Sequence, residues 1–487
     1  MDRNTDMFSN LPSSLLIIIA SFLSFKEAAR TCILSKQWLN IWREVENVDF
    51  DENNFVKLDE SEENQKVQRE VFINFARQFI ANHSQQVIKT LGFRCSKPGN
   101  FLVDMQNIVM FATSHNATGL RLDFSDPTWR EDAIMNHEAV SELPSHVYEH
   151  GQALESLKLF SCRFDASKFT NFSAIKSLSL GWININIGSI LVILESCPLL
   201  ETLHLKKCWN LEYFEVSKPG LRLQNLVLDK CDIRHEWLAI EGPRFQFFKY
   251  SGKVGQFLLE NQRDMVEAEL DFGMQTEFEE VGAFLYDLLQ ELFAARILTV
   301  CSVFLQSKLK LNTVAYLGLT SFSFVDGHSQ IIPSGDEPLG LQAPLDVRKL
   351  ILKTALHSNE YCGIKFMLRS SPRLETLTID IGPARIFPDY EPPYPFDPEE
   401  LWSRNFQVEF CVIETLRVVN VKGFKGTRNE LYVLRYLLHF GRAMEELNLY
   451  ASNEGGDNGE NREFYMGRAQ IVLGFYKASR NVSISVL

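Results

Sequence analysis

A short phrase recurs through the middle of the chain and constrains its fold more than any other feature of the sequence. The clearest copies are "LESLKLFSC" from Leu154, "LETLHLKKC" from Leu200 and "LQNLVLDKC" from Leu223, and "IKSLSLGW" from Ile175 lies between the first two. Their starts are 21, 25 and 23 residues apart, and repeats of this length are typical of solenoids. Apolar residues at +3 and +5 of each copy predict a short strand with one inward face.

Weaker copies extend this pattern along the chain. They begin at Ala117, Phe245, Val314, Val347, Leu374, Ile413 and Met444. Segments with helical periodicity, such as "SILVILESCPLL" and "IKFMLRSSPRL", lie between several of the copies. The spacing falls in the range of leucine-rich repeats. The sequence therefore predicts a parallel-sheet solenoid, with strands on the concave face and helices or irregular chain outside.

A globular doubly wound α/β domain is the alternative fold for such a pattern. It is disfavoured because no glycine-rich phosphate loop follows a strand and because the repeated phrase is monotonous. The intervals are irregular and reach 39 residues between Leu374 and Ile413, which indicates a degenerate array. The cysteines that follow three of the strands, Cys162, Cys208 and Cys231, fit a small buried turn position, and without a paired C-x2-C spacing a metal role is disfavoured.

The composition excludes several classes of protein. The chain has 487 residues, 45% of them hydrophobic, which is ample material for a core. Its net charge of -13 makes a broad attraction to nucleic acid or to an anionic membrane unexpected. The nine cysteines are odd in number and include no C-x-x-C pair, so we expect free thiols and a cytoplasmic and/or nuclear location.

The N-terminal stretch "LPSSLLIIIASFLSF" is apolar, yet its unbroken run from Leu15 to Ala20 is far too short for a bilayer span. Pro12 suits the first turn of a helix, and Ser24 to Glu27 has the form of a capping box for a second helix. Ser35 is a candidate cap for a third helix, with Trp38 and Trp42 one turn apart. Three helices this short cannot bury so much apolar surface alone. Either the rest of the chain covers it or another protein does.

The same residues resemble the F-box of plant F-box proteins. The matching positions are Leu11-Pro12, Leu15-Leu16, Ile19, Phe22-Leu23, Lys26-Glu27-Ala28, Leu34-Ser35-Lys36, Trp38 and Trp42. In one departure, Ile17-Ile18 stand where many family members carry a polar residue. The resemblance implies docking onto a Skp-type linker protein, itself held on a cullin. The residues that we predict for this contact, some of which must instead pack the module's own core, are Leu11, Pro12, Leu15, Leu16, Ile19, Leu23, Leu34, Ser35, Trp38 and Trp42.

The segments outside the repeats carry further predictions. The charged stretch 51–70 is interpreted as a solvated connector, and the stretch after it places Phe72, Phe75, Ala76, Phe79 and Ile80 on one face of a helix. The proline-rich segment 381–402 must be a loop, either a connector or a ligand-binding element. The last 80 residues resemble the FBD region of plant F-box proteins, through a strand at Leu416, the motif Gly423-Phe424-Lys425-Gly426, a helix over 430–438 and a strand at Leu447 and Leu449.

Motifs for catalysis are weak. His146 and His150 have the spacing of two zinc ligands on one helical turn, but the glutamate is misplaced for H-E-x-x-H. We interpret them as ordinary surface histidines. The sequence contains no nucleophile elbow and no P-loop. We therefore expect no catalytic activity, no metal and no cofactor.

The predicted fold class is α/β, with an N-terminal three-helix F-box followed by a degenerate leucine-rich-repeat solenoid with parallel strands. The predicted domains are the F-box at 1–50, an acidic connector and helix at 51–84, the leucine-rich-repeat region at 85–400 and the FBD-like region at 401–487. The resemblance implies a substrate-recognition subunit of an SCF-type (Skp-cullin-F-box) ubiquitin ligase that tethers an unknown protein substrate. The alternatives are a small-molecule receptor for a hormone or inositol phosphate, or a cullin-independent scaffold. An inositol phosphate needs clustered cations, and the repeats offer only scattered pairs such as Lys206-Lys207.

Overall fold

The computed structural model forms two compact units. It describes residues 11–83, 87–129, 141–260, 262–277, 281–307, 340–392, 396–403, 408–455 and 461–487. The first unit comprises Met1–Glu212 with Leu221–Leu223 and Cys231–Ile233, and the second unit comprises the remaining residues. We describe each unit by itself.

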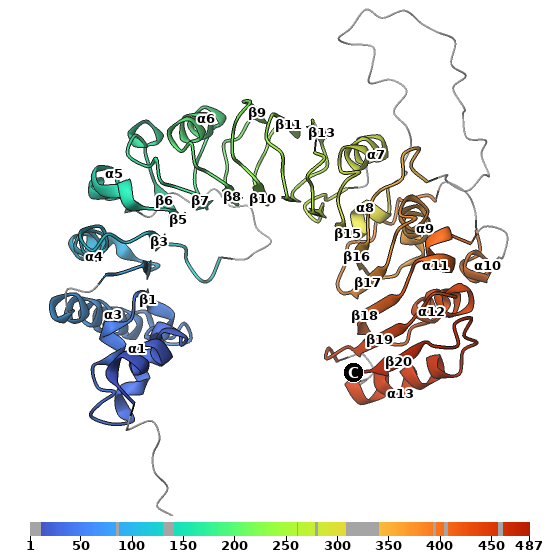
Figure 1. Cartoon of the computed structure of the whole chain (residues 1–487), viewed down its shortest axis with the longest axis horizontal. Coiled ribbons are helices and arrows are strands. Elements are labelled where there is room, and N and C mark those ends of the chain that lie inside the picture. The colour runs from blue at the N-terminus through green and yellow to red at the C-terminus, as the bar shows by residue number, and fades with distance from the viewer. Residues whose placement is uncertain are drawn as a thin grey trace, which may run out of the picture. The chain divides into compact units, whose positions relative to one another are not determined.

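The first unit is a parallel sheet that carries helices along one face (Figure 1). Its strands follow the order β1 (Asn47–Asp51), β2 (Thr90–Arg94), β3 (Gly119–Asp123), β5 (Ser156–Phe160), β7 (Ser177–Gly181) and β8 (Thr202–Lys206), and β4 (Ser141–Glu142) pairs separately with β6 (Cys162–Arg163). Its α-helices are α1 (Ser13–Ser21), α2 (Phe25–Arg30), α3 (Glu62–Asn82), α4 (Leu102–Ser114), α5 (Ser145–His150) and α6 (Ile187–Ser196). Helices α3 to α6 cover one face of the strands, and we call the opposite face the open face.

The second unit repeats this architecture. The main strands follow the order β10 (Asn225–Asp229), β12 (Phe247–Ser251), β14 (Glu267–Asp271), β15 (Ile297–Cys301), β16 (Lys349–Thr354), β17 (Thr376–Ile381), β18 (Val418–Phe424), β19 (Glu446–Ala451) and β20 (Ser483–Val486). A smaller sheet contains β9 (Phe214–Ser217), β11 (Trp237–Glu241) and β13 (Gln256–Leu259). Its helices are α7 (Gly282–Glu291), α8 (Ser302–Leu305), α9 (Tyr361–Ser370), α10 (Pro398–Ser403), α11 (Phe410–Glu414), α12 (Arg428–Phe440) and α13 (Arg462–Leu473).

The repeated phrase forms the strands that the sequence predicts. The +3 and +5 leucines of β5, Leu157 and Leu159, are completely buried, and Leu203 and Leu205 of β8 occupy the same positions in register. Among the described residues, every strand pairing within the main sheet of each unit is parallel, so the predicted α/β class with a parallel-strand solenoid is confirmed. The copy at Val314 lies outside the described residues. The domain boundaries stay a prediction.

One weak copy is displaced by three residues. Ile413 belongs to α11, so it cannot open a strand, and Leu416 takes the first apolar position of the phrase instead. The inward residues of β18 are then Val419 and Val421, and Val419 pairs with Leu377 of β17. The other features predicted near the C-terminus, the helix over 430–438 and the strand at Leu447 and Leu449, are confirmed as α12 and β19.

Several strands were missed because their apolar residues are not leucines. In β2 the phrase is Ile88, Leu91 and Phe93, all with at most 1% exposure. In β15 it begins with Ala295 and continues with Leu298 and Val300. Both copies keep the spacing of +3 and +5, so a search for any apolar residue at these positions could have found them.

The acidic stretch 51–70 is mostly exposed, as predicted for a solvated connector, but Glu52, Val56 and Arg69 within it are buried. Helix α3 begins at Glu62, where the Ser61 hydroxyl accepts a hydrogen bond from the Asn64 amide. Glu52 is 2% exposed and Arg69 is 6% exposed, and their side chains form an ion pair with an Nε–Oε2 distance of 3.3 Å. A charge run indicates solvent only where the charges lack partners inside the fold, and here two of them pair.

The proline-rich segment is also attached to the second unit through its described residues. Phe387 and Tyr390 are both buried. The Phe387 amide donates to Gln306 Oε1 at 2.8 Å, and Gln306 Nε2 donates to the Arg385 carbonyl at 2.8 Å. These contacts fix the segment 385–390 against α8. The ligand-binding interpretation of this loop stays a prediction.

Two further findings bear on the location of the chain. Among the described residues no helix is long and apolar enough to cross a membrane. All nine cysteines are free thiols, and all except the half-buried Cys32 are buried. Burial raises the pKa of Cys162 and of Cys197 to about 12, so these side chains stay protonated and behave as small apolar groups.

We predict that one thiol reacts rapidly in the native protein. Burial denies reagents access to the other eight. Titration with a disulfide reagent at mildly alkaline pH should therefore give one fast equivalent, which the Cys32→Ser variant lacks, and nine equivalents in denaturant. Two or more fast equivalents in the folded wild type would contradict the buried arrangement of the repeat cysteines.

Candidate functional site

The candidate site is the N-terminal segment 11–50. Helix α1 begins directly after Pro12, whose carbonyl accepts hydrogen bonds from the amides of Leu15 and Leu16. Helix α2 begins with the predicted capping box: Ser24 Oγ accepts from the Glu27 amide at 3.3 Å, and Glu27 Oε2 accepts from the Ser24 amide at 3.2 Å. The two reciprocal bonds satisfy backbone donors that the helix itself cannot use.

The predicted third α-helix does not form. Turns follow Ser35, and a short 3-10 helix, η3 (Ile41–Glu44), replaces it. Gln37 Nε2 donates to the Leu11 carbonyl at 2.6 Å, which ties this segment back to the start of α1. Tertiary packing of the two tryptophans therefore overrides the local helical pattern.

Three of the predicted docking residues belong to the chain's own core. Leu16 has no exposed surface, and Trp38 and Trp42 are 5% and 8% exposed. The Trp42 ring stacks on Phe75 of α3 with centroids 5.8 Å apart and lies 5.5 Å from Phe79. These three residues are inaccessible to another protein, and we assign them to the core that joins the segment to α3.

The remaining predicted residues lie at or near the surface. Leu15, Leu23 and Leu34 are 44%, 39% and 65% exposed. Pro12 is exposed, and Leu11, Ile19 and Ser35 are half-buried. Large apolar side chains that the sequence analysis did not select are also exposed: Ile18, Phe22, Ile33 and Leu39. Of these, Phe22 and Ile33 are the most exposed, at 84% each. We call Leu15, Ile18, Phe22, Leu23, Ile33, Leu34 and Leu39 the exposed F-box set.

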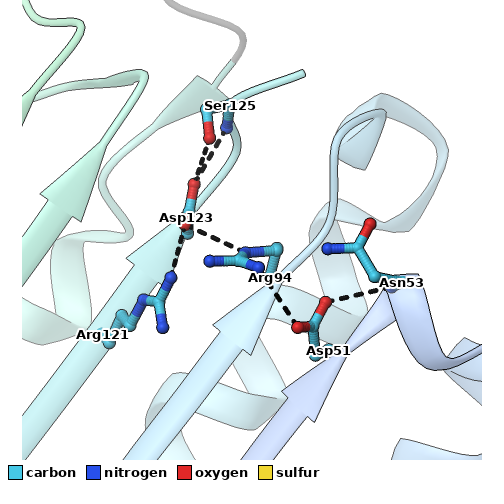
Figure 2. A network of polar contacts seen from close by, with 6 residues as sticks. All are labelled: Asp51, Asn53, Arg94, Arg121, Asp123 and Ser125. Carbon is cyan, nitrogen blue, oxygen red and sulfur yellow. Dashed lines mark hydrogen bonds and ion pairs between the residues drawn. The ribbon is translucent and has the colours of Figure 1, made fainter. Parts of the chain in front are cut away.

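A polar network fixes this segment to the repeats (Figure 2). Strand β1 belongs to the segment and pairs with β2, and Arg94 at the end of β2 bridges two carboxylates. Arg94 Nη1 donates to Asp51 of β1 at 3.2 Å, and Arg94 Nε donates to Asp123 of β3 at 3.1 Å. Asp123 also accepts from Arg121 at 2.8 Å and from the Ser125 hydroxyl at 2.5 Å.

The charge of Asp123 is stabilised by these donors. Burial alone would raise its pKa, but the Ser125 hydroxyl and the guanidinium groups of Arg121 and Arg94 outweigh that effect and lower the pKa below its ordinary value of 3.8. The carboxylate therefore stays ionised at neutral pH. It joins β3 to β2, and Arg94 extends the network to Asp51 on β1.

A groove lies between α3 and α4, on the helical side of the first unit. Its volume is about 620 Å³, and its lining is mainly apolar. Arg77 is the only arginine or lysine among the lining residues, and it already forms a bidentate pair with Asp104 at 2.5 and 2.7 Å. This groove therefore lacks the cation cluster that an inositol phosphate would need.

Helix α5 brings together three side chains with metal-ligand chemistry. The donor atoms of His146, Glu149 and His150 all lie within 4.8 Å of one another. His146 is half-buried, whereas Glu149 and His150 are exposed. An exposed group of this kind on one turn is common in the absence of a metal, so we keep the interpretation as surface histidines.

A helical module with exposed apolar side chains, joined strand to strand to a parallel repeat sheet, defines a repeat scaffold for protein binding. Comparison with known proteins makes the class specific. Residues 8–49 match the F-box domain, and residues 80–315 match the leucine-rich-repeat domain of the At1g61320/AtMIF1 type.

Full-length relatives share both regions. The chain is 32% identical to the F-box protein At3g62230 of Arabidopsis thaliana, over 91% of each chain. It is also 32% identical to the putative F-box/LRR-repeat protein At1g56400 of the same plant, over 95% of this chain and 91% of the relative. The chain belongs to the family of F-box/leucine-rich-repeat proteins. Proteins of this family generally act as non-catalytic substrate adaptors in SCF ubiquitin ligases, and F-box domains generally bind Skp-type linkers.

The division between core and surface predicts opposite effects for two adjacent leucines. Leu16→Ala leaves a cavity beneath α1 and should lower the free energy of unfolding by about 3 kcal/mol. Leu15→Ala truncates a side chain that is 44% exposed, so it should lower the free energy of unfolding by no more than about 1 kcal/mol. Urea denaturation followed by tryptophan fluorescence measures both. Equal effects of the two substitutions would show that the assignment of Leu16 to the core is wrong.

The network at Asp123 predicts a dependence of stability on pH. Because its pKa is lower in the folded state, the carboxylate contributes stability above its ordinary pKa of 3.8, and this contribution is lost as the pH falls through the folded value. Asp123→Asn should therefore lower the free energy of unfolding at neutral pH by about 2 kcal/mol, and the Tm with it. The difference in Tm from the wild type should shrink as the pH falls below 4. The exposed Asp59, replaced by Asn, is the control. A difference that stays constant with pH would contradict the prediction.

Proposed function

We propose that this chain is the substrate-recognition subunit of an SCF-type ubiquitin ligase, and that the exposed F-box set contacts the Skp-type linker. The observation that carries the proposal is the F-box match over residues 8–49 combined with the exposure of seven large apolar side chains in that segment. A surface of this kind is costly in a free protein, and it is typical of a site that another protein covers.

The F-box core explains how the docking residues are held in place. Leu16, Trp38 and Trp42 pack inward, and Trp42 contacts the aromatic side chains of α2 and α3. The side chains that remain outside, above all Phe22 and Ile33, are then presented by a fixed backbone. Presenting apolar side chains from a rigid support reduces the entropy lost on binding.

In this proposal the chain itself carries out no covalent chemistry. The repeats hold the substrate, and the F-box tethers it to the linker and through the linker to a cullin. A ubiquitin-charged enzyme on the same complex then meets substrate lysines at an effective concentration that tethering raises. The rate gain comes from proximity and orientation alone. The reducing compartment expected from nine free thiols, cytoplasmic or nuclear, is where such a complex would act.

Capture of a purified Skp-type linker tests the proposal. The double variant Phe22→Ser/Ile33→Ser removes the two most exposed apolar side chains of the segment without opening a cavity. We expect its affinity for the linker to fall at least about tenfold in a quantitative pull-down, because central apolar anchors dominate interface energies.

The matched control is Ile471→Ser in α13 of the second unit. Ile471 is also an exposed apolar residue, at 51%, but it lies outside the F-box. Capture by this variant should equal that of the wild type. Full capture by the Phe22→Ser/Ile33→Ser variant, with its Tm unchanged, would overturn the assignment of the docking residues.

A further inference from the structure

The open face of the first unit carries two cations at directly opposed positions. Arg121 on β3 and Lys158 on β5 are partners in register. Like charges opposite each other on neighbouring strands are destabilising. Arg121 is compensated by Asp123, with an Nη2–Oδ2 distance of 2.8 Å. It is also compensated by Asp49, whose carboxylate lies over Gly92, the register partner of Arg121 on β2. No carboxylate among the described residues forms an ion pair with the exposed Lys158. Lys158 is therefore the cation of this pair that a bound carboxylate can reach most directly.

An aromatic cluster adjoins these cations at the C-terminal ends of the strands. Phe160 ends β5 and leans over Gly181 of β7, where a Cβ atom would lie only 2.3 Å from its ring. The Trp182 ring lies 6.3 Å from Phe160 and 6.0 Å from Trp129, measured between centroids. All three rings are half-buried, so part of each remains accessible.

Trp182 occupies a backbone conformation that bulky residues avoid. Its φ of +49° places it in the left-handed region. The residues directly after β5, β8 and β10, which are Ser161, Lys207 and Lys230, share this conformation with φ between +50° and +54°. This turn therefore recurs in successive repeats, and in the other three repeats a serine or a lysine occupies the position of Trp182. An indole at this position costs conformational energy that folding does not require.

Cations and rings are in direct contact within this region. The Arg121 guanidinium carbon lies 5.9 Å from the centroid of Phe160, and the ammonium groups of Lys206 and Lys207 lie 5.2 and 5.4 Å from that of Trp182. Such contacts fix the cations beside flat apolar surface. In a chain with a net charge of -13, this local combination of cations and rings is complementary to an acidic partner that also carries a flat group.

We propose that Arg121, Lys158, Phe160, Trp182 and Lys206 form a binding site for an extended acidic peptide segment of the substrate. In the complex, an Asp or Glu carboxylate of the peptide lies between Arg121 and Lys158 and relieves their repulsion. A neighbouring aromatic or proline side chain of the peptide packs on Phe160 and Trp182. A carboxylate suits this site better than a phosphate, because Arg121 already shares its charge with Asp123 and phosphate recognition relies on clusters of uncommitted arginines. The inference rests on the proposed function in that the peptide belongs to the substrate.

Peptide selection on the intact chain tests this site. The probe is a phage-displayed library of random peptides, and we expect the selected pool to be enriched in Asp or Glu adjacent to Trp, Tyr, Phe or Pro. A labelled synthetic peptide from that pool should then bind Lys158→Glu at least about tenfold more weakly in fluorescence anisotropy, as expected for the loss of one partner of a charge pair. The matched control is Lys349→Glu, which changes an exposed lysine of β16 in the second unit. This variant should bind the peptide as tightly as the wild type.

A stability measurement separates a binding role from a structural one. Lys158→Glu places a carboxylate opposite Arg121 and replaces repulsion by attraction, so its Tm should equal or exceed that of the wild type even though binding is lost. A lowered Tm would indicate a structural lysine and would overturn the inference. A pool without acidic enrichment, unchanged peptide binding by Lys158→Glu, or tighter binding of the phosphoserine version of the peptide than of the glutamate version would also overturn it.

The proposed ligase role can fail separately. Linker capture is measured on the same protein preparations. Intact capture without peptide enrichment refutes the peptide site alone, whereas peptide enrichment without linker capture refutes the ligase role alone.

Discussion

The structure depends on one constraint: a single repeat cannot bury its own apolar row. Leu157 and Leu159 of β5 lie between the equivalent pairs of β3 and β7, and removing either neighbour would expose them. Burial and the parallel backbone ladder are therefore properties of the stack rather than of any one repeat. The same constraint explains the first strand. The F-box segment ends in β1, which pairs with β2 and covers the N-terminal end of the stack, so the module that we propose to dock onto a linker also completes the sheet.

The sequence predicted the part of the fold that depends on periodicity. Strands β5, β7, β8 and β10 followed from leucines at fixed spacing, whereas β2 was missed because Ile88 and Phe93 fill the same positions. The site was harder to predict, for a physical reason. Helix α1 is apolar nearly all round, so the pattern cannot distinguish Leu15 from Leu16. Only the aromatic packing of Trp42 with Phe75 and Phe79, more than 30 residues further along the chain, determines which side faces inward.

Charged residues misled the interpretation in one place and informed it in another. Glu52 and Arg69 occur in a stretch rich in acids, which suggests solvent, yet they pair in the interior. The sequence alone did not indicate this ion pair, because the two residues are 17 positions apart and are brought together by the turn before α3. Arg121 and Lys158 are the converse case. Each is unremarkable in the sequence, and only the register of β3 and β5 shows that they oppose each other. Pairing between distant segments decides whether a charge is structural or available to a partner.

The hydrogen-bonded continuity of β1 with β2 and β3 has a geometric consequence for a ligase adaptor. Within the described residues, β1 of the F-box segment pairs directly with β2, and Arg94 joins Asp51 to Asp123 across the strands. In the proposed role, a substrate bound on this unit would lie at a set distance from the F-box, and each strand along the sheet adds about 4.8 Å to that distance. In the proposed ligase role, the repeat that binds the substrate would therefore determine which substrate lysines come within reach of the transferring enzyme.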